Sequence, residues 1–162
     1  MNDLVSVAAR FAANRHEGQS YDGGPYTIHL AAVVAVLQRF GINDPEMLAA
    51  AWLHDVVEDT DTTNEELEPM FGDRVANLVY RVTNEMGRNR RERHAKTYPK
   101  IKASTDATTL KLADRIANSE ASLANRPDLL DMYKKEYAAF KNALFTAGTH
   151  DLMWAHLDTL LA

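Results

Sequence analysis

The sequence predicts an all-α protein, a bundle of about eight helices that forms a single domain over residues 1–162. Apolar residues recur with helical spacing in almost every segment, and no segment shows the sustained alternation of a half-buried strand. Turn residues interrupt the pattern at intervals that suit helices of ordinary length. A chain of 162 residues, 46% of them hydrophobic, can bury one sizeable core.

The N-terminal part predicts two helices joined by a loop. The first helix runs from about Asn2, a suitable cap, to Arg15, with an apolar stripe at helical spacing. Residues 19–26 form a loop, because two glycines followed by a proline cannot continue a helix. The second helix covers Thr27–Phe40, carries His29 in its first turn and stops at Gly41.

Three helices are expected next. Asp44 and Pro45 supply a cap and a first-turn proline for a helix that continues to about Thr60. Thr63 and Glu66 form a capping box for a short helix that ends near Gly72. Another helix covers about 73–85.

The C-terminal part predicts three more helices. One begins near Asp106 and carries an apolar face through Asn118. Arg126-Pro127 breaks the chain, and a long helix then runs from Pro127 to Ala147. A last helix over about Thr149–Leu161 could cap the core or pair with another subunit, which makes a homo-oligomer one expectation.

A basic segment lies between these two groups of helices, and its local net charge is positive although the chain as a whole is acidic. One interpretation is a solvated helix face. The other is a clamp for a polyanion, because arginine forks bind phosphate oxygens in pairs. Its cations are Arg88, Arg90, Arg91, Arg93, Lys96, Lys100 and Lys102.

Composition excludes several classes of function. The chain has no cysteine, so disulfides and thiolate metal sites are excluded and any metal must use histidine and carboxylate. A net charge of −5 argues against nucleic-acid binding by the whole surface. No apolar run is long enough to span a membrane. The N-terminus lacks the basic and apolar regions of a secretory signal, so the expected location is the cytoplasm.

The third predicted helix ends in a cluster of polar groups. His54 and Glu58 share one helical face, and Asp55 and Asp59 share the adjacent strip. The helix that leads to them is apolar, so this end should be partly buried, and buried carboxylates must be paired, protonated or bound to metal. The alternative is a surface His-Asp pair, and a metal site therefore needs further ligands.

Those ligands are available on two other predicted helices. His29, His54, Asp55 and Asp114 are together candidates for one divalent ion. Two imidazoles and two carboxylates suit manganese or iron, and zinc is an alternative. Asn118 lies one turn after Asp114 on the same side of its helix.

Several motifs resemble the HD phosphohydrolase superfamily, in particular its RelA/SpoT-type alarmone hydrolase domain. The order His…His-Asp…Asp carries the first resemblance, and the flanking residues carry the second over nearly the whole chain. No synthetase or regulatory domain accompanies it, which resembles a stand-alone small alarmone hydrolase. The matching motifs are His16-x-Gly18-Gln19, Pro25-Tyr26-x-x-His29, Leu53-His54-Asp55-Val56-Val57-Glu58-Asp59-Thr60, Phe71-Gly72, Val82-Thr83 and Leu110-Lys111-Leu112-Ala113-Asp114-Arg115-x-x-Asn118.

The resemblance implies one Mn²⁺ ion held by the four candidate ligands, with Fe²⁺ or Zn²⁺ as alternatives. It implies that Glu58 and Asp59 orient a water molecule and manage protons as general base and later acid. The implied reaction removes the 3′-pyrophosphate of a (p)ppGpp-like nucleotide. The implied substrate contacts are Asn118 for the sugar or base, Tyr137 near the nucleotide, and Lys96 (the favoured residue), Arg90, Arg91, Arg93 and Lys111 for the phosphates.

One loop departs from the family pattern. Guanine-hydrolysing members carry an Arg-Lys-Ser-type run where this chain has Ser20–Gly24. Tyr21 could stack on a base instead, but a tyrosine stack discriminates poorly between bases. The substrate could therefore be a guanosine or an adenosine alarmone. Alternatives are another nucleotide, such as a nucleoside phosphate or NADPH, and a catalytically silent nucleotide-binding module.

Overall fold

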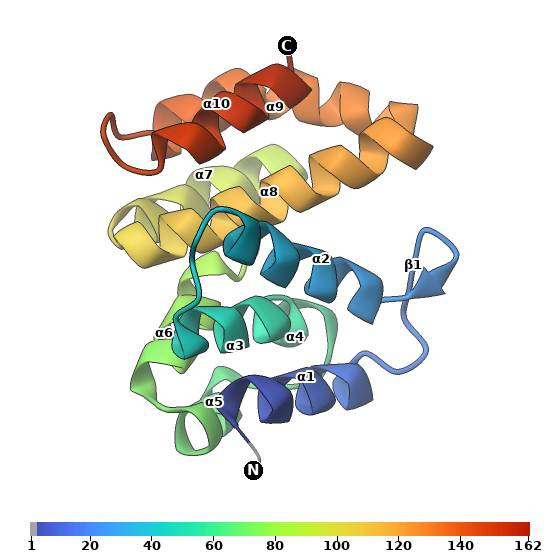
Figure 1. The fold of residues 1–162 in the computed structure, drawn as a ribbon, viewed down its shortest axis with the longest axis vertical. Coiled ribbons are helices and arrows are strands. Elements are labelled where there is room, and N and C mark those ends of the chain that lie inside the picture. Colours follow the sequence, from blue (N-terminus) through green and yellow to red (C-terminus); the bar gives the residue numbers. More distant parts are fainter. Residues whose placement is uncertain (1–2) are drawn as a thin grey trace.

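A computed structural model describes residues 3–162, and within that range the chain forms ten helices and one two-stranded hairpin (Figure 1). The all-α prediction is confirmed. The helices are α1 (Leu4–Arg15), α2 (Thr27–Arg39), α3 (Pro45–Leu53), α4 (Val56–Asp59), α5 (Asn64–Phe71), α6 (Asp73–Val82), α7 (Arg90–Lys102), α8 (Thr105–Asn125), α9 (Pro127–Leu144) and α10 (Asp151–Leu160), and the hairpin pairs β1 (Ser20–Tyr21) with β2 (Gly24–Pro25).

Helix starts follow the capping signals in the sequence. Asp3 caps α1 by accepting from the Ser6 amide at 2.7 Å, whereas the predicted cap Asn2 lies outside the described residues. Asp44 caps α3 with Pro45 in its first turn, as predicted. The predicted capping box before α5 is also present, since the Thr63 amide donates to Glu66 Oε2 at 2.7 Å.

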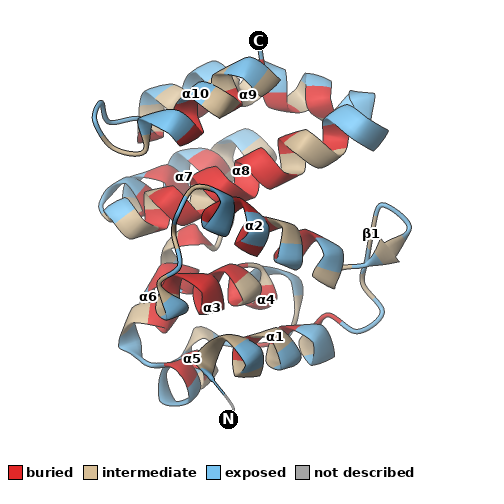
Figure 2. Cartoon of the chain, viewed as in Figure 1, coloured by how far each residue is buried: buried red, intermediate tan, exposed pale blue. Residues whose placement is uncertain are grey.

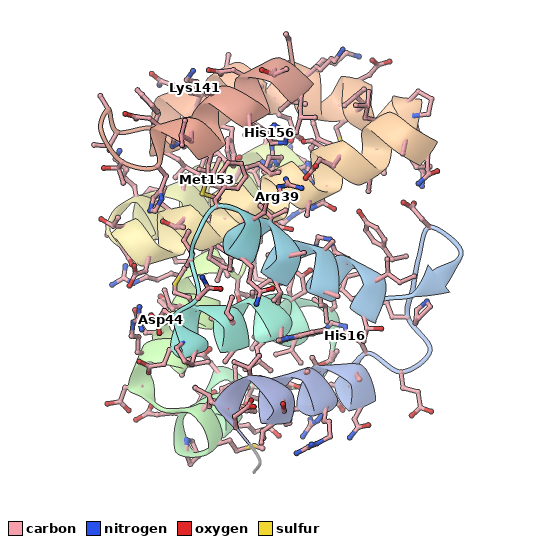
Figure 3. All side chains as sticks on the ribbon, in the orientation of Figure 1. His16, Arg39, Asp44, Lys141, Met153 and His156 are labelled. Carbon is pink, nitrogen blue, oxygen red and sulfur yellow. The ribbon has the colours of Figure 1, made fainter. Side chains whose placement is uncertain are left out.

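The central helix of the bundle is α8, which packs against α2, α6, α7, α9 and α10. Figure 2 shows buried residues along most of its length and along α3. Helix α3 is apolar nearly all round and is covered by α1, α2 and α6. The last helix caps this core within its own chain, because Met153, which Figure 3 labels, Trp154 and Leu157 are buried.

Three local features differ from the predictions. The basic segment, for which a helix was one interpretation, forms α7 in addition to the eight helices expected, and the predicted helix over 45–60 is split into α3 and α4. The predicted loop at 19–26 contains a short antiparallel hairpin. Asp22 and Gly23 turn it with φ values of 48° and 83°, as an Asp-Gly hairpin turn requires.

None of the helices between residues 3 and 162 combines the length and the apolar character needed to cross a bilayer.

Candidate metal centre and catalytic cavity

The His54-Asp55 pair occupies the break between α3 and α4, so the predicted continuous helix through residue 60 is wrong. The Nδ1 atom of His54 lies 2.7 Å from the Ala51 carbonyl oxygen. In an unbroken helix that carbonyl accepts from the amide of Asp55, four residues on. Side-chain competition for this acceptor explains the interruption. Asp55 takes φ −105° and ψ 0°, a sparsely occupied region in which active-site residues are common.

Four side chains converge at this break. His29 projects from the first turn of α2 and Asp114 from the middle of α8, and both are buried, as is His54. The Nε2 atoms of His29 and His54 are 3.3 Å apart. His29 Nε2 lies 3.6 Å from Asp55 Oδ2 and 3.0 Å from Asp114 Oδ1, and His54 Nε2 lies 3.0 and 3.4 Å from the same two oxygens.

The donor set fits a divalent ion. Ligands at about 2.1 Å from a metal are separated from one another by about 3.0–3.4 Å, close to the spacings observed here. A carbonyl oxygen can only accept, so His54 carries a proton on Nδ1, and Nε2 is the nitrogen that faces the cluster and is placed to bind a metal. Two imidazole nitrogens and two carboxylate oxygens in such close contact favour a shared cation.

Neighbouring charged side chains set the protonation state of the two carboxylates in the cluster, Asp55 and Asp114. Burial opposes ionisation of Asp55, but His54 more than compensates and lowers the pKa of Asp55 to about 2. Burial likewise opposes ionisation of Asp114, yet Lys111 and the two histidines hold the pKa of Asp114 well below its usual range. Both carboxylates are therefore anionic and available to a metal at neutral pH.

Glu58 and Asp59 line a cavity of about 210 Å³ together with three of the four candidate ligands, His29, Asp55 and Asp114. The Asn84 amide donates to Glu58 Oε1 at 2.8 Å, and Gln19 Nε2 donates to Asp59 Oδ2 at 3.1 Å. Both carboxylates reach water at the mouth of the cavity, while protein surrounds their other sides. This desolvation, reinforced by the nearby charge of Asp55, raises the pKa of Glu58 and of Asp59.

Cationic side chains from α7 and α8 also line the cavity. Lys111 Nζ lies 3.0 Å from Asp114 Oδ2, and Arg90 binds Glu136 of α9 through two hydrogen bonds. Arg115 is 2% exposed, and its guanidinium packs on the Phe140 ring at 4.3 Å. The cavity can therefore accept an anionic group beside the metal ligands.

Sequence reasoning assigned no role to several residues that line the cavity: Tyr26, Asn84, His94, Arg115 and Tyr133. Burial and the neighbouring cations lower the pKa of His94 to about 4, so this imidazole is neutral at pH 7. The helical phase of α7 is a signal that could have indicated His94, because it lies one turn after Arg90. Arg115 has a comparable signal, since it directly follows Asp114 inside an apolar helix.

The predicted substrate contacts divide into two groups. Tyr21 stacks on the His29 ring at 5.0 Å and donates from its hydroxyl to Asn118 Oδ1 at 2.9 Å, and Asn118 in turn donates to Asp114. Lys111 and Arg90 line the cavity with Asn118, and Arg93 lines an adjoining cavity that reaches Glu58.

Three other predicted contacts lie away from the central cavity. The Lys96 ammonium binds the Met86 carbonyl, and the Tyr137 hydroxyl binds Asp158 of α10 at 2.5 Å. Arg91 lines a separate groove between α7 and α9.

Comparison with known proteins agrees with this fold. The HD domain family matches residues 8–140, and the chain belongs to this family. An HD domain implies a divalent ion, and three of the four clustered ligands, His29, His54 and Asp55, present donor atoms within 4.8 Å of one another.

Among individual relatives, the guanosine-3′,5′-bis(diphosphate) 3′-pyrophosphohydrolase MESH1 of Danio rerio is 42% identical over 120 residues, which cover 71% of this chain and 67% of the relative. The Vibrio cholerae guanosine-3′,5′-bis(diphosphate) 3′-pyrophosphohydrolase is 40% identical over 125 residues, 72% of this chain but 18% of its own length. The chain thus spans about two thirds of one relative and less than a fifth of the other.

A solved structure, described as a metazoan ortholog of SpoT that hydrolyzes ppGpp, superposes on the chain with a TM-score of 0.85. Its sequence is 29% identical, and the match covers 99% of this chain and 94% of that one.

Proposed function

We propose that the protein is a metal-dependent pyrophosphohydrolase that removes the 3′-pyrophosphate group of a guanosine or adenosine alarmone of the (p)ppGpp type. The family match and the names of the relatives make the chain a hydrolase that acts on a nucleotide. One observation carries the proposal: three of the four candidate ligands, two carboxylates of raised pKa and several cations line one small polar cavity, and the fourth candidate, His54, lies 3.0 Å from Asp55 Oδ2. We further propose that residues 1–162 act as a single domain.

His29, His54, Asp55 and Asp114 would hold the ion, and we propose Mn²⁺, with Fe²⁺ or Zn²⁺ as alternatives for this nitrogen and oxygen donor set. When bound, such an ion lowers the pKa of water and offsets phosphate charge. Hydrogen bonds orient two of these residues. His54 Nδ1 donates to the Ala51 carbonyl, and the Tyr26 hydroxyl donates to Asp55 Oδ2 at 2.6 Å.

Glu58 and Asp59 supply the acid and base groups. Water must lose a proton as its oxygen bonds to the phosphorus, and the 3′ oxygen must gain one as the phosphorus–oxygen bond breaks. A carboxylate of raised pKa holds a proton more readily near neutral pH than an ordinary one, which suits both transfers. We assign the base to Glu58, because the Asn84 amide fixes one of its oxygens and leaves the other free.

The cations that line the cavity bind the pyrophosphate group. A polar space of about 210 Å³ suits the pyrophosphate rather than the whole nucleotide, so the nucleoside extends beyond it. We assign phosphate contacts to Lys111 and Arg90, which line this space, with Arg93 beside Glu58 in the adjoining cavity. Lys96 and Tyr137 are bonded elsewhere, and we assign them no phosphate contact.

Tyr21 and Asn118 form the predicted contact with the nucleoside. They are hydrogen-bonded to each other beside His29. Because an aromatic face stacks on every base, we propose that the enzyme discriminates weakly between guanine and adenine.

The test is product analysis of the purified protein with Mn²⁺, incubated separately with ppGpp and with its adenine counterpart. We expect pyrophosphate release from both, and the ratio of the two rates reports the base preference. No release from either, with metal binding demonstrated by calorimetry, would instead favour another nucleotide, such as a nucleoside phosphate or NADPH, or a silent nucleotide-binding module.

We also propose that the enzyme acts in the cytoplasm. A second copy of the chain is its expected protein partner, which the mass of the purified protein in light scattering will test.

A further inference from the structure

We infer that His16 and Gln19 are positioning residues that fix the Asp59 carboxylate through a hydrogen-bonded chain running from the end of α1 to the end of α4. This inference rests on the proposed function, because it concerns the group that manages protons there. The proposed mechanism leaves both residues without a role, although both are part of the His16-x-Gly18-Gln19 motif.

The motif builds a tight turn that returns Gln19 to His16. His16 ends α1, and Gly18 has a φ of +85°, a conformation that side chains with a Cβ rarely adopt. The Gln19 amide donates to the His16 carbonyl at 2.9 Å, which closes the turn. The two side chains consequently meet, and His16 Nδ1 lies 2.7 Å from Gln19 Oε1.

The direction of the hydrogen bonds from His16 through Gln19 to Asp59 is set by which atoms can donate. Gln19 Nε2 faces Asp59 Oδ2 at 3.1 Å, and an ionised carboxylate only accepts. The opposite end of the amide, Gln19 Oε1, also only accepts, so His16 must carry its proton on Nδ1. A proton on Nε2 alone would place two acceptors against each other and favour rotation of the amide, which would turn its oxygen toward Asp59.

His16 itself is held rigidly. The ring is 3% exposed and stacks on the Tyr26 ring with centroids 4.8 Å apart. Its Nε2 atom is buried without a hydrogen-bond partner, as a bare acceptor of the Nδ1–H tautomer can be. A residue that only filled this space would be better apolar, because an unpaired buried polar atom costs stability. The imidazole is therefore explained by the proton that it donates to Gln19.

The Asp59 carboxylate, which accepts the last of these hydrogen bonds, needs a partner that fixes its rotamer. Asp59 ends the four-residue helix α4 and reaches water, so without hydrogen bonds from the protein its side chain would be free to sample several rotamers. A directed hydrogen bond from an amide that is fixed at its other end selects one of them. Tyr26 does the same for Asp55, so the segment between α1 and α2 holds two carboxylates of the site.

The test compares kcat, KM and Mn²⁺ affinity in variants of this chain. Gln19→Met keeps the side-chain length and should lower kcat about 10- to 100-fold, the range expected when an orienting hydrogen bond is lost, with little change in KM or Mn²⁺ affinity. His16→Leu should have a similar effect. His16→Asn places an amide donor near the position of Nδ1 and should recover most of the loss, whereas His16→Asp offers an acceptor and should not.

Glu17→Gln, an exposed change in the same turn, is the matched control and should leave kcat unaltered. Wild-type kcat in Gln19→Met would overturn the inference. So would His16→Asn that is no more active than His16→Leu at equal thermal stability, since that result indicates a packing role alone.

A measurement without turnover separates this inference from the proposed function. Nitrogen NMR of the His16 ring should show the Nδ1–H tautomer in the wild type, and the Nε2–H tautomer would overturn the chain of hydrogen bonds. Intact ppGpp after incubation with the metal-loaded wild type would count against the proposed function, while the tautomer still decides the inference.

Discussion

The Glu136→Gln variant should destabilise the protein more than its position near the surface indicates. Glu136 on α9 accepts from Arg90 of α7 and faces Arg115 of α8, with 3.6 Å between Glu136 Oε2 and Arg115 Nη1. Its carboxylate thus connects three helices. Glutamine keeps the shape of the side chain but removes the charge that faces two guanidinium groups.

The expected cost follows from the burial of each partner. Loss of one partner from a fully buried ion pair costs about 3–5 kcal/mol. Arg90 is 40% exposed, so water screens its share, which is worth less than about 1 kcal/mol. Arg115 is 2% exposed but keeps its contacts with the Phe140 and Tyr133 rings. We therefore expect a loss of about 2 kcal/mol, or a melting temperature lower by about 4–8 °C.

Urea denaturation at pH 7 measures this loss, and Glu120→Gln is the matched control. Glu120 also lies between two nitrogen-bearing side chains, Arg39 at 2.8 Å and His156 at 3.7 Å, both labelled in Figure 3. All three of these side chains are at least one-third exposed, so the control should cost less than about 1 kcal/mol.

The pH dependence gives a second criterion. Burial opposes ionisation of Glu136, but the Arg90 guanidinium more than compensates, so its pKa in the folded protein is lowered. A lowered pKa contributes stability that is present above the unfolded value, about 4.3, and is lost as the pH falls through the folded value. The gap between wild type and Glu136→Gln should therefore shrink in acid. Equal stability at pH 7, or a gap that does not narrow as the pH falls below the unfolded pKa, would refute the reasoning.

Three further predictions concern the site. His54→Ala and Asp55→Ala should each abolish Mn²⁺ binding and turnover, and calorimetry that shows metal bound to either variant would remove that residue from the ligand set. Glu58→Gln should retain the metal but lose about 10²- to 10⁴-fold in kcat. Normal turnover in this variant would exclude Glu58 as the base. Lys111→Met should raise KM and flatten the salt dependence of binding, whereas Lys96→Met should change neither, because the Lys96 ammonium is bonded to Met86 outside the cavity. A larger effect at Lys96 would reverse this assignment.

Much of the fold was predictable because helix starts and stops have local causes. The Asp44-Pro45 start and the Thr63–Glu66 capping box depend on residues within one turn. The break after Leu53 was not predictable in this way. It depends on the rotamer of His54, because the ring Nδ1 of His54 hydrogen-bonds to the Ala51 carbonyl in place of a backbone amide. Periodicity describes which face is apolar but not which side chain competes for a carbonyl.

The site shows the same division. His29 and Asp114 were predicted together with His54 because each has a place on a helix with an apolar face and each belongs to a motif that resembles the HD superfamily. The phosphate contacts were harder to predict, because α7 is polar and its sequence does not indicate which face is buried. In the structure the buried face runs through His94 and Ile101, which brings Arg90 to the cavity and points Lys96 away. Tyr137 likewise faces α10, a partner that no local pattern specifies.

The ligand set also has a consequence for folding. The four proposed ligands belong to α2, the α3–α4 break and α8, segments that are far apart in the chain and meet at the centre of the bundle. An ion held by all of them acts as a removable cross-link that closes long chain loops. Its binding free energy adds to the stability of the native state. Chelation should thus first loosen the contact between α2 and α8. The rate of amide hydrogen exchange along these two helices should therefore rise as the fraction of metal-bound protein falls.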